Sequence, residues 1–234
     1  CVKNFFTTVC DNLSSSSDET TGKIAVEYDF NGSTMGYASY TIGSKPGGTN
    51  LTYGFSTREE LDADFRFGSP VVPPMVYRAF ESENLESLEF GLKSDFFNGK
   101  ARANIAVFSY DYENLQFQAT DPDPYRGGVA NIPNSEMDGV EIEFTALLGD
   151  SITFDMNLGF IDTEVTSEYE VLDNVLAYQY FFTEEQERYE LREDVKGNML
   201  AKTPEFTADA TLTYEGELAS GNPINVILQF IRRG

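Results

Sequence analysis

The side chains best suited to chemistry in this chain are carboxylates at alternate positions. Glu141 and Glu143 are separated by one residue, and so are Asp121 and Asp123. Two carboxylates can act as acid and base in a glycosidase, and carboxylate oxygens bind Ca²⁺. Alternate residues of one strand, however, are more simply charges on one face of a sheet, and the two aspartates lack the spacing and terminal Glu of an EF-hand loop. We therefore expect no enzyme, no catalytic residue, and no bound metal or cofactor.

The residue types that are rare or missing narrow the chemistry further. The chain contains no histidine, which excludes Ser-His-Asp and Cys-His nucleophilic sites and imidazole-based metal sites. The spacing of Cys1 and Cys10 fits neither a CxxC redox pair nor a four-ligand zinc site, so a small loop disulfide and two free thiols both stay open. The formal charge of -23 makes a nucleic-acid partner unexpected, because such a partner requires a basic patch.

The elements that position the carboxylates are predicted to be strands, because apolar and polar side chains alternate along much of the chain. The predicted strands cover residues 23–30, 34–42, 86–96, 100–118, 135–147, 152–160, 204–215 and 224–231. Short connections are expected at residues 31–33, 97–99, 148–151 and 216–222, and long loops at residues 43–85, 119–134 and 164–201. Part of the last loop, residues 183–194, is compatible with a short helix. Short turns would then lie at one end of an antiparallel meander and long loops at the other.

Strand length and loop asymmetry favour a transmembrane barrel over a soluble β-sandwich, although a sandwich strand also alternates. Barrel strands cross the bilayer in about nine to eleven residues, with short turns on one side and long loops on the other. The polar face carries charges of both signs, as expected for a watery lumen: Glu89, Lys93, Asp95, Arg102, Glu141, Glu143, Asp155 and Asp209. The opposite face would meet lipid through Leu88, Phe90, Leu92, Ile105 and Val107. The predicted fold class is therefore an all-β, antiparallel transmembrane β-barrel meander.

Four stretches, in order, resemble the β-barrel of TonB-dependent outer-membrane receptors. They are YASYTIGSKPGGTN at residues 37–50, ESLEFGLKSDFFNGKARANIAVFSYDYENLQ at 86–116, NSEMDGVEIEFTA at 134–146 and KTPEFTADATLTYE at 202–215. The resemblance covers about residues 22–231. One departure is Ser44, which stands where the family commonly has an aromatic or another bulky residue.

The resemblance implies about eight strands of a larger barrel, which has 22 strands around a plug in the family. Residues 1–21 would be the remnant of an external loop, and residues 22–234 a segment from the carboxy-terminal part of the barrel. The plug domain, the energy-coupling segment and the closing aromatic strand are missing from the sequence, so we expect a fragment. Turns such as residues 97–100 would be periplasmic.

The resemblance also implies a function and partners. The whole receptor would sit in the outer membrane of a Gram-negative bacterium, surrounded by lipid, and would take up a scarce ligand such as a ferric siderophore, cobalamin or a glycan. The inner-membrane TonB energy complex would drive import through the plug. The three long loops would capture the ligand, and their aromatic residues could either stack on it or anchor the loops: Tyr53, Phe55, Tyr125, Tyr178, Tyr180, Phe181 and Phe182. No individual ligand contact is predicted.

Two alternatives remain open from the sequence. One is a complete eight-stranded outer-membrane barrel with a structural or adhesive role, which the even strand count favours. The other is a soluble β-sandwich that acts as a binding module.

Overall fold

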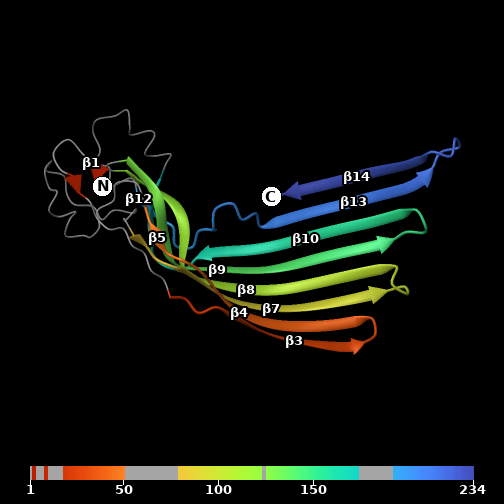
Figure 1. Cartoon of the computed structure of the whole chain (residues 1–234), viewed down its shortest axis with the longest axis horizontal. Coiled ribbons are helices and arrows are strands. Elements are labelled where there is room, and N and C mark those ends of the chain that lie inside the picture. The colour runs from red at the N-terminus through yellow and green to blue at the C-terminus, as the bar shows by residue number, and fades with distance from the viewer. Residues whose placement is uncertain (1, 4–7, 10–17, 51–78, 123–124, 174–191) are drawn as a thin grey trace.

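The computed structural model describes residues 2–3, 8–9, 18–50, 79–122, 125–173 and 192–234. Eight strands form one sheet in the order β3-β4-β7-β8-β9-β10-β13-β14, and every neighbouring pair is antiparallel (Figure 1). Their bounds are Gly22–Asn31 (β3), Thr34–Lys45 (β4), Glu83–Phe96 (β7), Ala101–Pro122 (β8), Tyr125–Leu147 (β9), Ile152–Val165 (β10), Phe206–Glu217 (β13) and Pro223–Arg233 (β14). The predicted all-β antiparallel meander is therefore confirmed.

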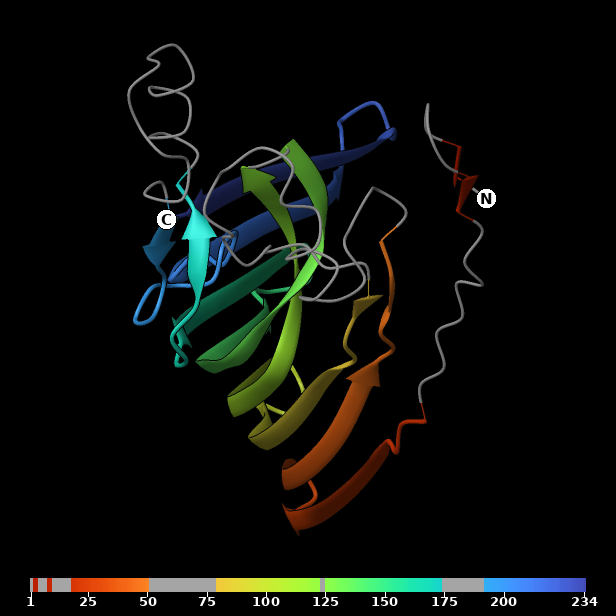
Figure 2. The same cartoon turned by 90° about the vertical axis from the view of Figure 1, so that its left-hand side faces the viewer.

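The sheet is curved but open. Seen along the strands, it forms an arc with β3 at one edge and β14 at the other (Figure 2). These two strands are not paired with each other, so the described residues do not close a barrel. They also do not contain a second large sheet packed on the first, as a β-sandwich would require, because the other sheets of the described part have two strands each.

Six short strands form three small two-stranded sheets outside the main one. Their bounds are Val2–Lys3 (β1), Thr8–Val9 (β2), Gly48–Thr49 (β5), Ala79–Phe80 (β6), Glu170–Leu172 (β11) and Arg192–Asp194 (β12). Strand β1 pairs with β2, β5 with β6 and β11 with β12. The last three residues of the predicted helix at 183–194 are thus strand β12, and the remainder lies outside the described residues. Among the described residues, no helix has the length and apolarity needed to cross a membrane.

The predicted short connections are present at one end of the sheet, which we call the short-turn end. The turn between β7 and β8 places three consecutive residues in the left-handed region, Phe97 at φ 53°, Asn98 at 58° and Gly99 at 81°. The backbone N–H of Gly99 donates to the carbonyl of Phe96 over 3.1 Å. Asn and Gly adopt this conformation with the least strain, which explains the turn at this point.

The prediction that residues 119–134 form a long loop is wrong. Strands β8 and β9 continue to Pro122 and Tyr125, and their hairpin curves away from the other strands at the long-loop end (Figure 1). One register holds along the whole hairpin and omits only the pair Asn114 and Pro133. Pro133 has no N–H to donate to the ladder, and Asn114 has a φ of 57°. The ladder is interrupted at this one pair, and the same register continues on both sides of it.

None of the residues that the structure describes covers the apolar face of the sheet. Its large side chains remain strongly exposed, for example Ile24 at 67% and Phe90 at 53%. Most of the buried apolar residues instead lie near the long-loop end, in β8, β9, β10 and β11: Ala119, Ala130, Ile132, Val165 and Leu172. A water-soluble protein rarely leaves so continuous an apolar surface uncovered.

We expect the turn between β7 and β8 to depend on backbone conformation alone. A Cβ added at Gly99 would meet nothing within 4 Å, so Gly99→Val should lower the free energy of unfolding by about 1–2 kcal/mol through its positive φ. Gly22→Val is the matched control, since Gly22 is equally uncrowded but has no such φ. Urea unfolding of the full-length protein measures both, and equal losses in the two variants would refute this explanation.

Candidate functional site: the polar face and the long-loop end

The polar face of the sheet holds the charged residues that the alternation predicted there. Cross-strand hydrogen bonds join many of them, including Tyr37 Oη to Glu89 Oε1 at 2.6 Å and Asn104 Nδ2 to Glu143 Oε2 at 2.9 Å. Near the short-turn end, the Arg102 guanidinium donates to both carboxylate oxygens of Asp95, at 2.6 and 3.0 Å. Further links on this face are Thr145 Oγ1 to Asp155 at 2.8 Å and Gln229 Nε2 to Asp209 at 3.1 Å.

Glu89, Gly91 and Lys93, which alternate along β7, form one contact group around Tyr37. Tyr37 pairs with Gly91 across β4 and β7, and its ring lies where a Cβ on Gly91 would be. Its hydroxyl donates to Glu89, and Lys93 Nζ lies 5.6 Å from the centre of its ring. The three residues therefore have distinct roles. Glu89 accepts the hydrogen bond, Gly91 leaves space for the ring, and Lys93 lies over the face of the ring.

A second aromatic ring covers a second glycine on this face. The ring of Phe108, which is only 6% exposed, occupies the space beside Gly139 and stacks on Tyr110 with ring centres 4.8 Å apart. Gly139 lies two residues before Glu141 in β9, and like Gly91 it leaves space for an aromatic ring of the neighbouring strand. Both pairs anchor an aromatic side chain on the polar face.

The carboxylates singled out by spacing do not form a reactive pair. Glu141 and Glu143 are both exposed on the polar face of β9, and Glu143 accepts its hydrogen bond from Asn104. Asp121 lies in β8, while Asp123 is outside the described residues. No group of three or more acidic or cysteine side chains with metal-binding geometry occurs in the part of the chain that the structure describes.

Three side-chain amides at the long-loop end join the extended hairpin to the segments that lead into residues 51–78. We call Asn50, Gln116 and Asn131 the amide cluster. Asn50 bonds both the N–H and the carbonyl of Val129, at 2.8 Å each. Asn131 accepts from the N–H of Glu81 at 2.8 Å and donates to the carbonyls of Glu81 and Asn114.

Gln116 completes this arrangement from strand β8. Its amide nitrogen lies within 3.0–3.4 Å of three carbonyl oxygens, those of Lys45, Pro46 and Glu81. The amide cluster thus fixes chain on both sides of residues 51–78 to the β8–β9 hairpin. Sequence reasoning gave none of the three a role, although Asn50 and Gln116 end two of the stretches that resemble the family. Their partners are backbone groups far away in the chain, which no spacing reveals.

The small sheet of β11 and β12 is also tied to this end. The ring of Tyr169 meets the ring of Phe117 edge to face, with centres 5.7 Å apart. Asp194 accepts the backbone N–H groups of Lys196 and Tyr169, at 3.0 Å each. These two hydrogen bonds, that from Lys196 first, lower the pKa of the Asp194 carboxyl below its ordinary value.

Of the aromatic loop candidates, only Tyr125 lies among the described residues. Tyr125 begins strand β9. The residues that lie outside the described part are Cys1, Cys10, Tyr53, Phe55, Tyr178, Tyr180, Phe181 and Phe182. Their proposed contributions to ligand capture, and the pairing of the cysteines, stay predictions.

A curved meander with one exposed apolar face and one charged face is the wall of a barrel, and comparison with known sequences agrees. The family model described as TonB dependent receptor-like, beta-barrel, matches residues 2–230. The chain belongs to this family. TonB-dependent receptors are receptors and transporters of the Gram-negative outer membrane, so the predicted resemblance is confirmed.

Several named proteins are similar to this chain in sequence or in fold. A probable TonB-dependent siderophore receptor PiuA of Acinetobacter baumannii is 25% identical over 130 residues, which are 56% of this chain and 15% of that protein. The ferric yersiniabactin uptake receptor FyuA of Yersinia pestis superposes with a TM-score of 0.59 at 15% identity, over 92% of this chain and 26% of the receptor. The copper transporter OprC superposes with a TM-score of 0.52 at 16% identity, over 84% and 24%. The structural likenesses show the shared fold, and this chain spans about a quarter or less of each relative.

We expect Asn131→Ala to loosen the chain next to residues 51–78. The substitution removes the partners of the Glu81 N–H and of two carbonyls, so amide exchange in residues 79–83 should accelerate about tenfold. Hydrogen–deuterium exchange with mass spectrometry on the full-length receptor measures this. Gln118→Ala is the control, because Gln118 is exposed on the same hairpin and should leave the exchange unchanged. Unaltered exchange in Asn131→Ala would show that the amide cluster does not hold this segment.

Asp194 should stabilise the β11–β12 sheet only while it is ionised. Its folded pKa is lowered, so its contribution is present above the ordinary Asp value of about 3.9 and is lost as the pH falls through the folded pKa. Asp194→Asn should therefore destabilise the receptor at pH 7 and make progressively less difference below about pH 4. Urea unfolding of both proteins from pH 7 to acid gives the comparison. A difference that grows on acidification would contradict the assignment.

Proposed function

We propose that this chain forms part of the wall of an outer-membrane receptor that imports a scarce ligand, a ferric siderophore, by energy-coupled transport. The observation that carries the proposal is the two-faced sheet of a TonB-dependent receptor family member. One face is apolar and carries exposed large side chains on most of the eight strands, and the other bears charges of both signs in a hydrogen-bonded network.

The apolar face suits contact with lipid. Leu88, Phe90, Leu92, Ile105 and Val107 are between 41% and 53% exposed, in agreement with their predicted position. In outer-membrane barrels the strands place such residues outward and polar residues toward the lumen. On this proposal the short-turn end is periplasmic and the long-loop end is external.

The polar face suits a water-filled or plugged lumen. Glu89, Lys93 and Arg102 point to this side. Hydrogen bonds to the neighbouring strands hold Glu89 and Arg102, and a cation–π contact with Tyr37 holds Lys93. The plug and the coupling segment for the inner-membrane TonB complex would belong to other parts of the full receptor. The chain's short span relative to its relatives supports this placement.

Ligand capture is assigned to the long-loop end. The amide cluster and the Phe117–Tyr169 contact provide fixed bases from which the external loops extend. The names of relatives support a siderophore, since PiuA is a probable siderophore receptor and FyuA takes up ferric yersiniabactin. The copper transporter OprC shows that the same fold also carries a different cargo, so the test must separate iron from copper.

Growth under iron limitation tests the proposal. A strain that lacks the full gene should lose growth on one ferric siderophore of a panel, and the intact gene on a plasmid should restore it. Uptake of the iron-labelled siderophore should also stop when the TonB complex is inactivated. Unchanged growth on every siderophore, or a defect in copper uptake alone, would reject the siderophore assignment.

If the apolar face meets lipid, lysine substitutions at two neighbouring residues of β10 should have different effects on stability. Leu158→Lys puts a charge on the apolar face and should cost about 2–4 kcal/mol of folding free energy if that face meets lipid near the midplane. Asn157→Lys places the same charge on the polar face between Glu143 and Asp209 and should be tolerated. Unfolding titrations of the full receptor in lipid vesicles measure both. Equal effects would mean that the apolar face is not in lipid.

A further inference from the structure

The turn between β7 and β8 carries the most exposed large apolar side chain among the residues that the structure describes. The side chain of Phe97 is 79% exposed. Its ring stacks on no other aromatic ring in the described part of the chain. A ring this exposed gains little free energy from packing within the protein.

The backbone that carries this ring is strained. Phe97 has a φ of 53°, in the left-handed region, where the Cβ of an ordinary residue lies too close to the following carbonyl oxygen. The other non-glycine residues with a positive φ in the described part are two asparagines and a lysine, so no other large apolar residue adopts this conformation there. Strain of this kind is retained where a function compensates for it. The benefit of Phe97 therefore has to come from a contact outside the chain.

The same turn carries an unpaired positive charge. The backbone N–H of Lys100 donates to the carbonyl of Phe97 over 3.3 Å, so the two residues lie at the two ends of one tight turn. The side chain of Lys100 is exposed, and no acid of the described residues forms an ion pair with its ammonium group. The turn thus presents an apolar ring and a cation close together.

Two further turns at the short-turn end also expose apolar side chains. The turn after β9 carries Leu147 and Leu148, which are 49% and 54% exposed, and the N–H of Leu147 donates to the carbonyl of Lys100 over 2.7 Å. The turn after β13 carries Leu218, which is 49% exposed. If water surrounded these turns, all of these side chains would remain exposed to it.

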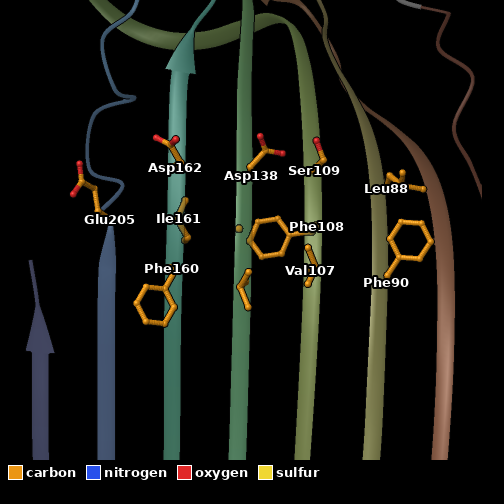
Figure 3. A pocket seen from close by; sticks show the side chains of 12 residues that line it. Leu88, Phe90, Val107, Phe108, Ser109, Asp138, Phe160, Ile161, Asp162 and Glu205 are labelled. Atoms are coloured by element: carbon orange, nitrogen blue, oxygen red, sulfur yellow. The ribbon is translucent and has the colours of Figure 1, made fainter.

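The apolar turns continue the apolar face of the sheet. In the middle of that face, Figure 3 shows a groove where Val107 lies between the larger Phe90 and Phe160. Along β7 the same face extends to Phe96, the last residue of the strand, which directly precedes Phe97. The surface that the proposed function places in lipid therefore reaches the turn itself.

We propose that the β7–β8 turn anchors the short-turn end in the phospholipid headgroup layer of the bilayer. The Phe97 ring enters the boundary between headgroups and acyl chains, and the Lys100 ammonium group donates hydrogen bonds to lipid phosphates. This inference rests on the proposed function, which places the apolar face in lipid. It goes beyond that function because it seats the turn inside the interface instead of in water, and so fixes the position of the strand ends relative to the bilayer.

The combination of ring and cation selects this environment. An apolar protein surface would accept the ring but would leave the Lys100 ammonium group without a counter-charge. Water would solvate Lys100 but would leave the strain at Phe97 uncompensated. The headgroup layer offers acyl chains to the ring and phosphate oxygens to the ammonium group within the reach of one turn.

Spin labels on the full-length receptor in phospholipid vesicles test the proposal. Single cysteines for a nitroxide label, Asn98→Cys, Leu92→Cys or Glu193→Cys, are introduced into a receptor whose own cysteines are replaced by serine. Collisions with oxygen, which concentrates in lipid, and with a water-soluble nickel chelate are measured. We expect the Asn98→Cys label to resemble the Leu92→Cys label on the apolar face and to differ from the Glu193→Cys label, which is exposed at the long-loop end. Adding Phe97→Asn should shift the Asn98→Cys label toward water.

The outcomes separate this inference from the proposed function. A nickel-accessible Asn98→Cys label together with an oxygen-accessible Leu92→Cys label overturns the anchor and leaves the lipid-facing wall intact. An Asn98→Cys label shielded from both reagents also overturns it, because that pattern indicates burial against protein. A water-exposed Leu92→Cys label would instead refute the membrane placement in the proposed function.

The sign of a stability change gives a second test. Asn tolerates the left-handed region, so Phe97→Asn should stabilise the receptor if the ring has no contact and destabilise it if the ring lies in lipid. We expect urea unfolding in vesicles to show a folding equilibrium constant lowered about tenfold. Lys100→Gln should lower this constant about fivefold in vesicles with anionic phospholipid, whereas Lys202→Gln, exposed at the long-loop end, should not. A stabilised Phe97→Asn receptor, or equal effects of the two lysine substitutions, would reject the anchor.

Discussion

Eight strands must pair in phase if a continuous apolar face is to lie opposite a continuous polar one. Side chains alternate along each strand, so a slip of one residue in any pair would carry apolar residues to the charged side. The ladders meet this requirement: Phe90, Val107, Val140 and Phe160 form one row across four strands. The lipid contact and the polar lumen that we propose both depend on this phase.

Glycines covered by aromatic rings help to define the register. A Cβ at Gly91 would collide with the Tyr37 ring, and one at Gly139 would collide with Phe108. Each ring therefore fits only opposite its own glycine, and a shifted strand would meet a side chain there instead. The hydroxyl of Tyr37 also donates a hydrogen bond to Glu89. Both the shape of the ring and this hydrogen bond therefore favour one register between β4 and β7. The alternation of Glu89, Gly91 and Lys93 in the sequence therefore reflects their contacts with Tyr37 on the neighbouring strand.

Alternation predicted the eight strands and the short turns well, because those features depend on neighbouring residues and on local turn chemistry. It failed at residues 119–134, where Pro122, Gly127, Gly128 and Pro133 are typical of a loop. Ladder pairing between β8 and β9 compensates for that local preference and extends both strands beyond the sheet. The contacts of the amide cluster could not be predicted from the sequence for a different reason. Asn50 and Val129 are 79 residues apart, and an amide that bonds a distant backbone has no local pattern.

The two ends and the middle of the sheet are stabilised by different surroundings. In the middle, apolar side chains remain exposed and require lipid, whereas the long-loop end buries its own small residues and satisfies its backbone with side-chain amides. That division is expected where strands leave a bilayer and enter water. A bilayer also tolerates no unpaired backbone at a sheet edge, yet β3 and β14 each have one free side in the described residues. If the sheet stands in the membrane as we propose, both edges must pair with further strands, so its stability is a property of the closed receptor and has to be measured there.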